Sequence, residues 1–181
     1  MNRTYKTEGI ILKRTALGEA DRLVTILTRH HGKLKVLRTG VRRITSKRAP
    51  SLELFNHSSF FLHHGKTFDT VSDAQTINSF VLLKKHFLFV GSAYMVSELL
   101  DRLLAEGQEH EGVYDRALHL LNQLNQNNTE KVVEGLLFDF KIFLLSNLGF
   151  LSHATVLSPV TVDQFIEETI ERKLKSTRLL Y

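Results

Sequence analysis

Residues 23–36 read Leu-Val-Thr-Ile-Leu-Thr-Arg-His-His-Gly-Lys-Leu-Lys-Val, and this stretch decides the fold of the first half of the chain. Its β-branched first half is typical of a strand, and His31-Gly32 supplies a turn before a second strand. In that second strand Leu34 and Val36 alternate with Lys33 and Lys35. Because alternate residues of a strand point to opposite faces, we expect a half-buried strand with both lysines on its other face.

Three further short runs have the composition of strands, at Gly9–Lys13, Ser59–His63 and Thr67–Val71. Together with the first two they make about five strands in roughly 70 residues, which is the size of a small antiparallel barrel such as the OB-fold. The sequence therefore predicts an OB-fold nucleic-acid-binding domain over residues 1–79.

From about Asn78 the apolar residues recur at helical rather than strand spacing. The stripes are Val96, Leu99, Leu100, Leu103 and Leu104; Tyr114, Leu118, Leu121 and Leu124; and Val132, Val133, Leu136, Leu137, Phe140, Phe143 and Leu144. Gly149 follows the third stripe where a left-handed cap is favoured. A capping box of Thr161 and Gln164, just after Pro159, predicts a last helix that runs through Leu174. We expect residues 80–181 to form an all-α helical domain, so the fold class is α+β with two domains.

Charge is divided unequally between the two halves. Residues 1–80 hold 14 Lys/Arg and 6 Asp/Glu, whereas residues 81–181 hold 10 and 13, within a total net charge of +5. A compact domain with so large a positive excess attracts polyanions through its long-range field. The first half is therefore the candidate for contact with nucleic acid.

Several features favour a cytoplasmic protein without disulfides. The chain has no cysteine, which removes disulfide bonds and cysteine-based zinc sites. Residues 1–8 contain no apolar stretch suited to a secretion signal. The longest apolar run, Phe87–Ser97, is much shorter than the ~20 residues of a membrane span. We expect a protein that is neither exported nor bound to a membrane.

No pattern of residues indicates catalysis. Gly65-Lys66-Thr67 resembles the end of a phosphate-binding P-loop, but Phe60 stands where that motif needs glycine and a strand follows. Glu19 and Asp21 lie in a short turn beside Arg22, where local turn and salt-link chemistry explains them. We expect a protein that is not an enzyme and has no small-molecule substrate and no cofactor.

Two histidine pairs, His30-His31 and His63-His64, have the residue type of metal ligands. Adjacent residues on a strand point to opposite faces, so neither pair can present both imidazoles to one ion. We interpret them as turn histidines and expect no metal site.

Residues 38–48 form the strongest candidate binding segment. They read Arg-Thr-Gly-Val-Arg-Arg-Ile-Thr-Ser-Lys-Arg, with five cations and no carboxylate. Such a segment can contact consecutive phosphates and release their counterions, and the lysines of the preceding strand extend the same field. The alternative is a solvated charged loop. The predicted DNA-binding residues are Lys33, Lys35, Arg38, Arg42, Arg43, Lys47 and Arg48.

Aromatic residues of the first half could stack on unpaired bases. The candidates are Tyr5, Phe55, Phe60, Phe61 and Phe68. Most of them fit the core of the barrel better. Of the neighbours Phe60 and Phe61, one must face inward and one outward, so at most one can be a stacking surface.

Runs along nearly the whole chain resemble the bacterial RecO family of recombination mediators in order and spacing. They are Thr7-Glu8-Gly9-Ile10-Ile11-Leu12, Gly18-Glu19-Ala20-Asp21-Arg22, Gly32-Lys33-Leu34, Gly40-Val41-Arg42-Arg43, Ser46-Lys47-Arg48, Phe68-Asp69-Thr70-Val71, Leu148-Gly149-Phe150 and Arg172-Lys173-Leu174-Lys175-Ser176-Thr177-Arg178-Leu179-Leu180. The resemblance implies an OB-fold joined to a helical domain. It also implies a nucleoid-associated role in DNA repair: binding of single- and double-stranded DNA, annealing of complementary strands, and action with RecR to load RecA onto strands coated by single-stranded-DNA-binding protein (SSB).

The sequence departs from the family's pattern at two places. Ile44 occupies a position of the basic loop that is often proline in the family. After Phe150 many relatives insert a four-cysteine zinc module, whereas this chain passes directly through residues 151–155 toward the last helix. The resemblance therefore implies no bound zinc.

The last helix is the predicted docking surface for the acidic, apolar carboxyl-terminal tail of SSB. The candidate residues are Lys173, Leu174, Lys175 and Arg178. An ordinary helix end, where cations compensate the dipole, explains the same residues equally well. Two other functions also fit the sequence: an adaptor that binds an acidic partner protein, and an RNA-associated protein, since phosphate contacts do not separate RNA from DNA.

Overall fold

The computed structural model describes residues 3–19, 21–39, 50–126, 128–151 and 157–180. The chain forms two compact units. Unit 1 comprises Met1–Ser79 with Leu104–Glu109, and unit 2 comprises Phe80–Leu103 with His110–Tyr181. The sequence division at residue 79 thus differs for the short segment 104–109, which belongs to the first unit. Within these described ranges no helix is long and apolar enough to cross a bilayer.

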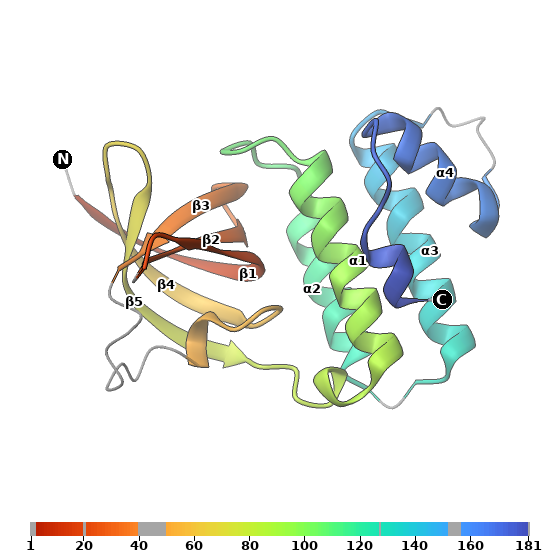
Figure 1. Ribbon diagram of the computed structural model, residues 1–181, viewed down its shortest axis with the longest axis horizontal. Coiled ribbons are helices and arrows are strands. Elements are labelled where there is room, and N and C mark those ends of the chain that lie inside the picture. Colours follow the sequence, from red (N-terminus) through yellow and green to blue (C-terminus); the bar gives the residue numbers. More distant parts are fainter. Residues whose placement is uncertain (1–2, 20, 40–49, 127, 152–156, 181) are drawn as a thin grey trace. The chain divides into compact units, whose positions relative to one another are not determined.

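Unit 1 is a closed barrel (Figure 1). Its strands in the described ranges are β1 (Thr4–Leu17), β2 (Asp21–Thr28), β3 (Lys33–Arg38), β4 (His57–His63) and β5 (Asp69–Asn78). They follow the order β1-β2-β3-β5-β4, and β4 pairs with β1 to close the ring. Only the β3–β5 pair among these ladders is parallel. A five-stranded barrel of this kind is OB-like, which confirms the predicted fold.

The barrel closes because β1 is long enough to pair with two strands. Gly9 faces both Thr28 of β2 and Ser58 of β4, and a register shift between Ile11 and Lys13 bends the strand there. A bulge of this kind increases local twist, as closure requires. The inward residues that fill the barrel are Ile11, Val24, Ile26, Val36, Leu52, Phe60, Leu62 and Ala74.

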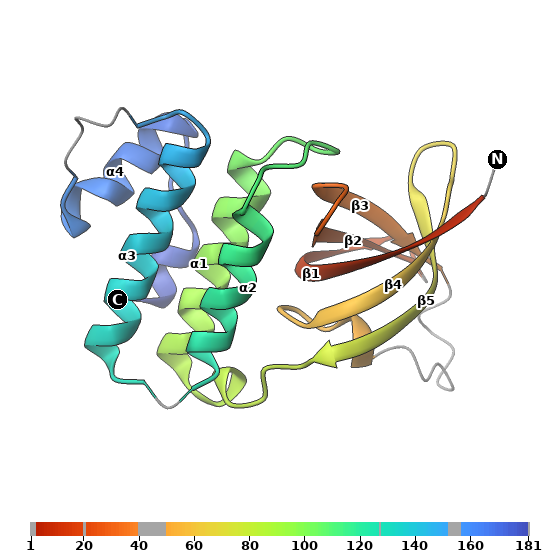
Figure 2. The ribbon, with the colours of Figure 1, turned by 180° about the vertical axis from the view of Figure 1, so that it is seen from behind.

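Unit 2 is helical (Figure 2). The described helices are η2 (Leu83–Lys85), α1 (Phe87–Leu103), α2 (Val113–Leu124), α3 (Glu130–Asn147), α4 (Pro159–Thr169) and η3 (Ser176–Leu179), where η marks a 3₁₀-helix. Their core contains Leu99, Leu100, Leu121, Phe140, Leu144 and Ile166. The switch from strands to helices confirms the α+β class.

The ends of α3 and α4 test two sequence predictions. Gly149 has φ 78° directly after α3, as predicted for a left-handed cap. The predicted box of Thr161 and Gln164 is wrong, because Ser158 is the N-cap of α4. The Ser158 side chain accepts from the Thr161 N–H while the Thr161 hydroxyl accepts from the Ser158 N–H. Pro159 thus occupies the first turn, where its missing N–H costs nothing.

Candidate nucleic-acid interface

Strand β3 carries three of the predicted DNA-binding residues. Leu34 and Val36 pack on the barrel core, in agreement with the predicted alternation. Lys33, however, is only 6% exposed and Arg38 only 7%. The expectation that both lysines of this strand lie on a solvated face is therefore wrong for Lys33.

The segment Leu104–Glu109, a part of unit 1, covers the start of β3. The Gly107 N–H donates to the Lys33 carbonyl at 2.8 Å, and the Lys35 ammonium lies 2.9 Å from a Glu106 carboxylate oxygen. Strand β5 pairs with β3 only at Val36 and Leu37, so the start of that edge is open to this segment. Lys35 stays 39% exposed beside Glu106. A phosphate that binds Lys35 must therefore compete with a carboxylate.

Four of the predicted residues, Arg42, Arg43, Lys47 and Arg48, lie outside the described residues. At the strand end that leads into their loop, Arg38 of β3 stands opposite Arg22 of β2. Arg38 is only 7% exposed, so of these two arginines Arg22 is the one that solvent reaches. Arg22 is exposed, so it adds a cation that the sequence prediction did not include.

A cluster of three aromatic rings lies in the barrel unit. The Tyr5 ring stacks on the His64 ring with centroids 4.7 Å apart and planes at 26°, and meets the His31 ring edge-on at 4.9 Å. Sequence analysis missed this cluster because its members come from β1, the β2–β3 turn and the β4–β5 loop. We refer to Tyr5, His31 and His64 as the ring cluster.

Asp69 holds two members of the ring cluster, Tyr5 and His64. Its carboxylate accepts from the Tyr5 hydroxyl at 2.5 Å and from the Gly65 N–H at 3.2 Å, and lies 3.4 Å from His64 Nδ1. Burial acts to raise the pKa of Asp69, but the hydrogen bonds from Tyr5 and Gly65 and the nearby His64 outweigh it and lower the pKa. Burial, with the hydrogen bond to Asp69, raises the pKa of Tyr5. Asp69 is therefore ionised and Tyr5 protonated at neutral pH.

The other aromatic candidates divide as the strand pattern predicts. Phe60 is fully buried and Phe61 is 45% exposed, so the expectation of one inward and one outward ring is confirmed. Phe55 is buried. Phe68 is only partly exposed. Phe61 alone of these four phenylalanines has the exposure that a stacking surface needs.

The predicted docking residues do not lie on α4: Lys173, Leu174 and Lys175 follow it, and Arg178 lies in the short η3. Helix α4 ends at Thr169, and Leu174 is 3% exposed in the segment that follows it. Lys173, Lys175 and Arg178 are exposed. The helix prediction fails here because Glu171, with φ 51°, turns the chain after α4. Leu174 is thus part of the core and cannot offer its side chain to a partner.

The carboxylate of Glu98 holds this terminal segment against α1. It accepts from the Lys175 N–H at 3.1 Å, the Ser176 N–H at 2.8 Å and the Ser176 hydroxyl at 2.7 Å. Burial acts to raise the pKa of Glu98, but these hydrogen bonds outweigh it and the pKa is lowered. A side chain at Gly91 would force this segment to shift, because a Cβ there would lie 2.7 Å from the Leu179 carbonyl oxygen.

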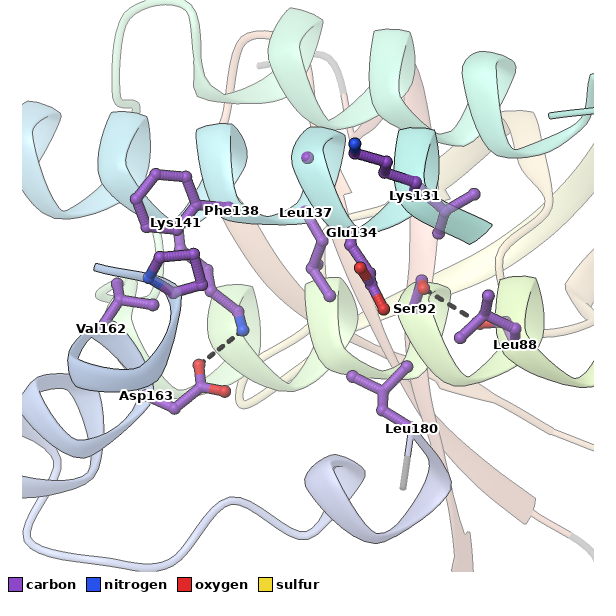
Figure 3. Close-up of a pocket in the computed structure, with 13 residues that line it drawn as sticks. Leu88, Ser92, Lys131, Glu134, Leu137, Phe138, Lys141, Val162, Asp163 and Leu180 are labelled. Carbon is purple, nitrogen blue, oxygen red and sulfur yellow. Dashed lines mark hydrogen bonds and ion pairs between the residues drawn. The ribbon is translucent and has the colours of Figure 1, made fainter. Parts of the chain in front are cut away.

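Unit 2 also contains an apolar cleft of about 340 Å³ (Figure 3). Its apolar walls include Leu88, Leu137, Phe138, Val162 and Leu180. At its base the Lys141 ammonium donates to Asp163 at 2.5 Å, and both side chains are largely buried. Lys131 and Glu134, both exposed, line it as well. Apolar walls beside exposed charges suit a peptide in which an apolar residue stands next to a charged one.

Within the described ranges no group of three or more His, Asp or Glu side chains could hold a metal ion. The two histidine pairs contribute one ring each to the ring cluster instead.

Comparisons with known proteins agree with this architecture. The family model described as "Recombination protein O N terminal" matches residues 1–80, and the one described as "Recombination protein O C terminal" matches residues 89–154. The chain is 35% identical over 149 residues to the DNA repair protein RecO of Roseiflexus sp. (strain RS-1), covering 82% of this chain and 51% of that protein.

Two further relatives show the same coverage. The DNA repair protein RecO of Desulforudis audaxviator is 34% identical, over 80% of this chain and 57% of the relative. That of Pelotomaculum thermopropionicum is 31% identical, over 81% and 56%. The chain thus spans about half the length of the curated relatives that it matches. With both matched regions in chain order and a barrel followed by helices, this chain belongs to the RecO family of DNA repair and recombination proteins.

Proposed function

We propose that this chain is a non-catalytic recombination mediator that binds single- and double-stranded DNA through its barrel unit. The observation that carries the proposal is the pair of family matches, over residues 1–80 and 89–154, on a chain whose barrel half holds the positive charge. In this proposal residues 1–79 are the nucleic-acid-binding domain and residues 80–181 the partner-docking domain, in the cytoplasm at the nucleoid.

The proposed DNA contacts are the basic loop, with Arg42, Arg43, Lys47 and Arg48, together with Lys35 of β3. Lys33 and Arg38 contribute through the field of their charges rather than by direct contact, because these residues are only 6% and 7% exposed. Such contacts read the backbone and not the bases, so binding is independent of sequence and strongly dependent on salt.

The salt dependence of binding tests the loop. A labelled single strand is titrated at several salt concentrations with the wild type, Arg42→Ala and Arg43→Ala. Each variant should lower the magnitude of the log–log salt slope by about 1, since each removes one phosphate contact. Lys85→Ala, an exposed cation of unit 2, is the control and should leave the slope unchanged. Wild-type slopes in both arginine variants would exclude the loop.

The proposed activities are annealing of complementary strands and, with RecR, loading of RecA onto SSB-coated DNA. The direct test is strand annealing on DNA coated with SSB. An adaptor or an RNA-associated protein has no reason to anneal these strands, so failure would favour those functions. Competition between RNA and DNA of one sequence would then separate the two alternatives.

The proposed docking partner in unit 2 is the acidic, apolar tail of SSB. Lys173, Lys175 and Arg178 offer exposed cations for it, but Leu174 is buried and the apolar contact must come from another surface. The cleft beside Lys131 has apolar walls of the required kind. Binding of a tail peptide is measured for Lys175→Ala, Arg178→Ala and Lys131→Ala. Weaker binding in Lys131→Ala alone would move the site from the terminal cations to the cleft.

A further inference from the structure

The ring cluster has no role in the phosphate contacts proposed above. We propose that Tyr5, His31 and His64 form a stacking site for an unpaired nucleobase of single-stranded DNA. The proposal rests on the proposed function, which it deepens by naming where a base, rather than a phosphate, is held.

Both histidines of the ring cluster are exposed. The His64 side chain is 58% exposed although one of its faces stacks on Tyr5. His31 is exposed as well, and it contacts the same tyrosine edge-on. A ring cluster whose role is only to fill a core would bury its members. Here the outer faces of the two imidazoles stay open to a planar ligand.

Two of the rings, Tyr5 and His64, are held in place before any ligand binds. Asp69 engages both Tyr5 and His64, and it also accepts from the N–H of Gly65 in the same loop. The loop is tight, because a Cβ at Gly65 would lie 2.0 Å from the Phe68 carbonyl oxygen. Side chains fixed in this way lose little conformational entropy when a base stacks on them.

The charge around the ring cluster favours a nucleotide over an uncharged aromatic ligand. The Arg3 carbonyl accepts from the His64 N–H at 2.8 Å, which places Arg3 beside the loop, and Lys66 belongs to that loop. Both residues are exposed. A base on the imidazole would leave its flanking phosphates close to these cations. Base stacking on aromatic rings beside a cationic track is the usual way to hold single strands without reading sequence.

Duplex DNA cannot use such a site, because its bases are already stacked on their neighbours. The stacking site should therefore contribute to the binding of single-stranded DNA and not to the binding of double-stranded DNA. Stacking also releases few counterions, so its loss should change affinity without changing the salt slope.

The test compares binding of a labelled oligo-dT strand and of a duplex by the wild type, His64→Ala, His31→Ala and His64→Phe. His64→Ala should bind the single strand roughly tenfold more weakly, the loss expected for one base stack. Its salt slope and its affinity for the duplex should equal those of the wild type. His64→Phe, which restores a ring, should recover most of the affinity. His30→Ala, an exposed neighbour outside the ring cluster, is the matched control and should bind like the wild type.

A second readout follows the base itself. A strand with 2-aminopurine in place of one adenine should lose fluorescence on binding to the wild type and to His64→Phe, and less so on binding to His64→Ala. Stacking quenches the fluorescence of this base directly. If His64→Phe does not restore the quenching, the weaker binding of His64→Ala reflects a general loss of structure and not the missing ring, and the proposal is overturned.

The failures of the two proposals are distinguishable. If His64→Ala and His31→Ala bind single strands like the wild type while Arg42→Ala lowers the salt slope, the stacking site is wrong and the proposed function stands. An equal loss for single strand and duplex would also overturn the stacking site. If the wild type binds no DNA, both proposals fall together.

Discussion

Two segments outside the α-helices and strands, one in each unit, lie against a regular element in closely similar ways. In unit 1 the segment 104–109 covers the start of β3, and in unit 2 the segment 174–180 covers α1. Each needs a glycine beneath it, since a Cβ at Gly32 would lie 2.1 Å from the Gln108 carbonyl oxygen and one at Gly91 would lie 2.7 Å from that of Leu179. Glutamates hold both segments: Glu106 pairs with Lys35 in unit 1, and in unit 2 Glu98 accepts from Lys175 and Ser176 while Glu167 accepts from the Leu174 N–H.

The two segments have opposite effects on the predicted cations. In unit 1 the covering segment encloses Lys33 and places Glu106 beside Lys35. In unit 2 the covering segment itself carries Lys175 and Arg178, which stay exposed. A run of cations in a sequence therefore indicates a positive electrostatic field around a unit, but it does not show which cationic side chains are accessible to a ligand.

The largest effect is expected where segment 104–109 crosses the turn before β3. Gly32 has φ 61°, and an alanine there adds backbone strain to the contact with Gln108. Gly32→Ala should lower the free energy of unfolding by about 3 kcal/mol, measured by urea denaturation. Gly18→Ala is the matched control, because it has φ 62° with nothing within 4 Å. It should cost only about 1 kcal/mol for the strain. Equal losses would mean that the segment does not pack on Gly32.

Removing Glu98 from unit 2 should have the next largest effect. Glu98→Ala leaves the N–H groups of Lys175 and Ser176 without their carboxylate acceptor, and should lower the free energy of unfolding by about 2 kcal/mol. Hydrogen exchange should show faster exchange at residues 175 and 176. An unchanged exchange rate at these two positions would contradict the assigned role of Glu98.

The same carboxylate predicts a dependence on pH. The pKa of Glu98 in the folded protein is lower than 4.5, the ordinary value of a glutamate carboxyl. The stabilisation is therefore present above pH 4.5 and is lost as pH falls through the lower folded pKa. Glu98→Gln should be less stable than the wild type at neutral pH, and the difference should shrink in acid. If the free energies of unfolding of the wild type and Glu98→Gln differ by the same amount at every pH, Glu98 does not cause the pH dependence.

A smaller effect is expected at the glycine of α1. Gly91→Ala gains helix propensity but meets the Leu179 carbonyl oxygen, and the net loss should be about 1 kcal/mol. Gly135→Ala in α3 has nothing within 4 Å and should instead gain about 0.5 kcal/mol. Thermal denaturation of the two variants gives the sign of each change. A gain in both would break the parallel between the two covering segments.

The smallest effect should appear in binding rather than stability. Glu106→Gln removes the carboxylate that competes with phosphate for Lys35, so affinity for a labelled single strand at low salt should rise by about two- to threefold. Glu109→Gln, an exposed acid of the same segment, controls for the change in net charge. If affinity rises equally in both variants, Glu106 acts only through the net charge and not through its contact with Lys35.

Much of the fold could be predicted because it depends on local patterns. The alternation of Leu34 and Val36 with Lys33 and Lys35 placed the inner face of β3 correctly, and Gly149 marked the end of α3. The failures occurred where a local pattern was ambiguous. Thr161 and Gln164 fit a capping box as well as Ser158 and Thr161 do, so the start of α4 was misplaced. No glycine or proline near Leu174 indicates that α4 has already ended.

The candidate site was predicted less completely, for a physical reason. The five cations of residues 38–48 lie close together in the sequence, so their combined positive charge could be predicted from the sequence alone. The ring cluster joins residues 5, 31 and 64, and Tyr5 and His64 share the carboxylate of residue 69. No periodicity links such distant positions, and nothing in the sequence indicates that one histidine of each pair contacts Tyr5.

The sequence by itself determined the order of strands and helices, the division of charge between the halves and the family to which the chain belongs. These properties depend on spacing, composition and local conformational preference. Only the tertiary structure decided that Lys33 is buried, that Lys35 forms an ion pair with Glu106, and that Leu174 is a core residue. Accessibility is set by contacts between residues far apart in the chain, and these form only when the barrel closes and the helices pack.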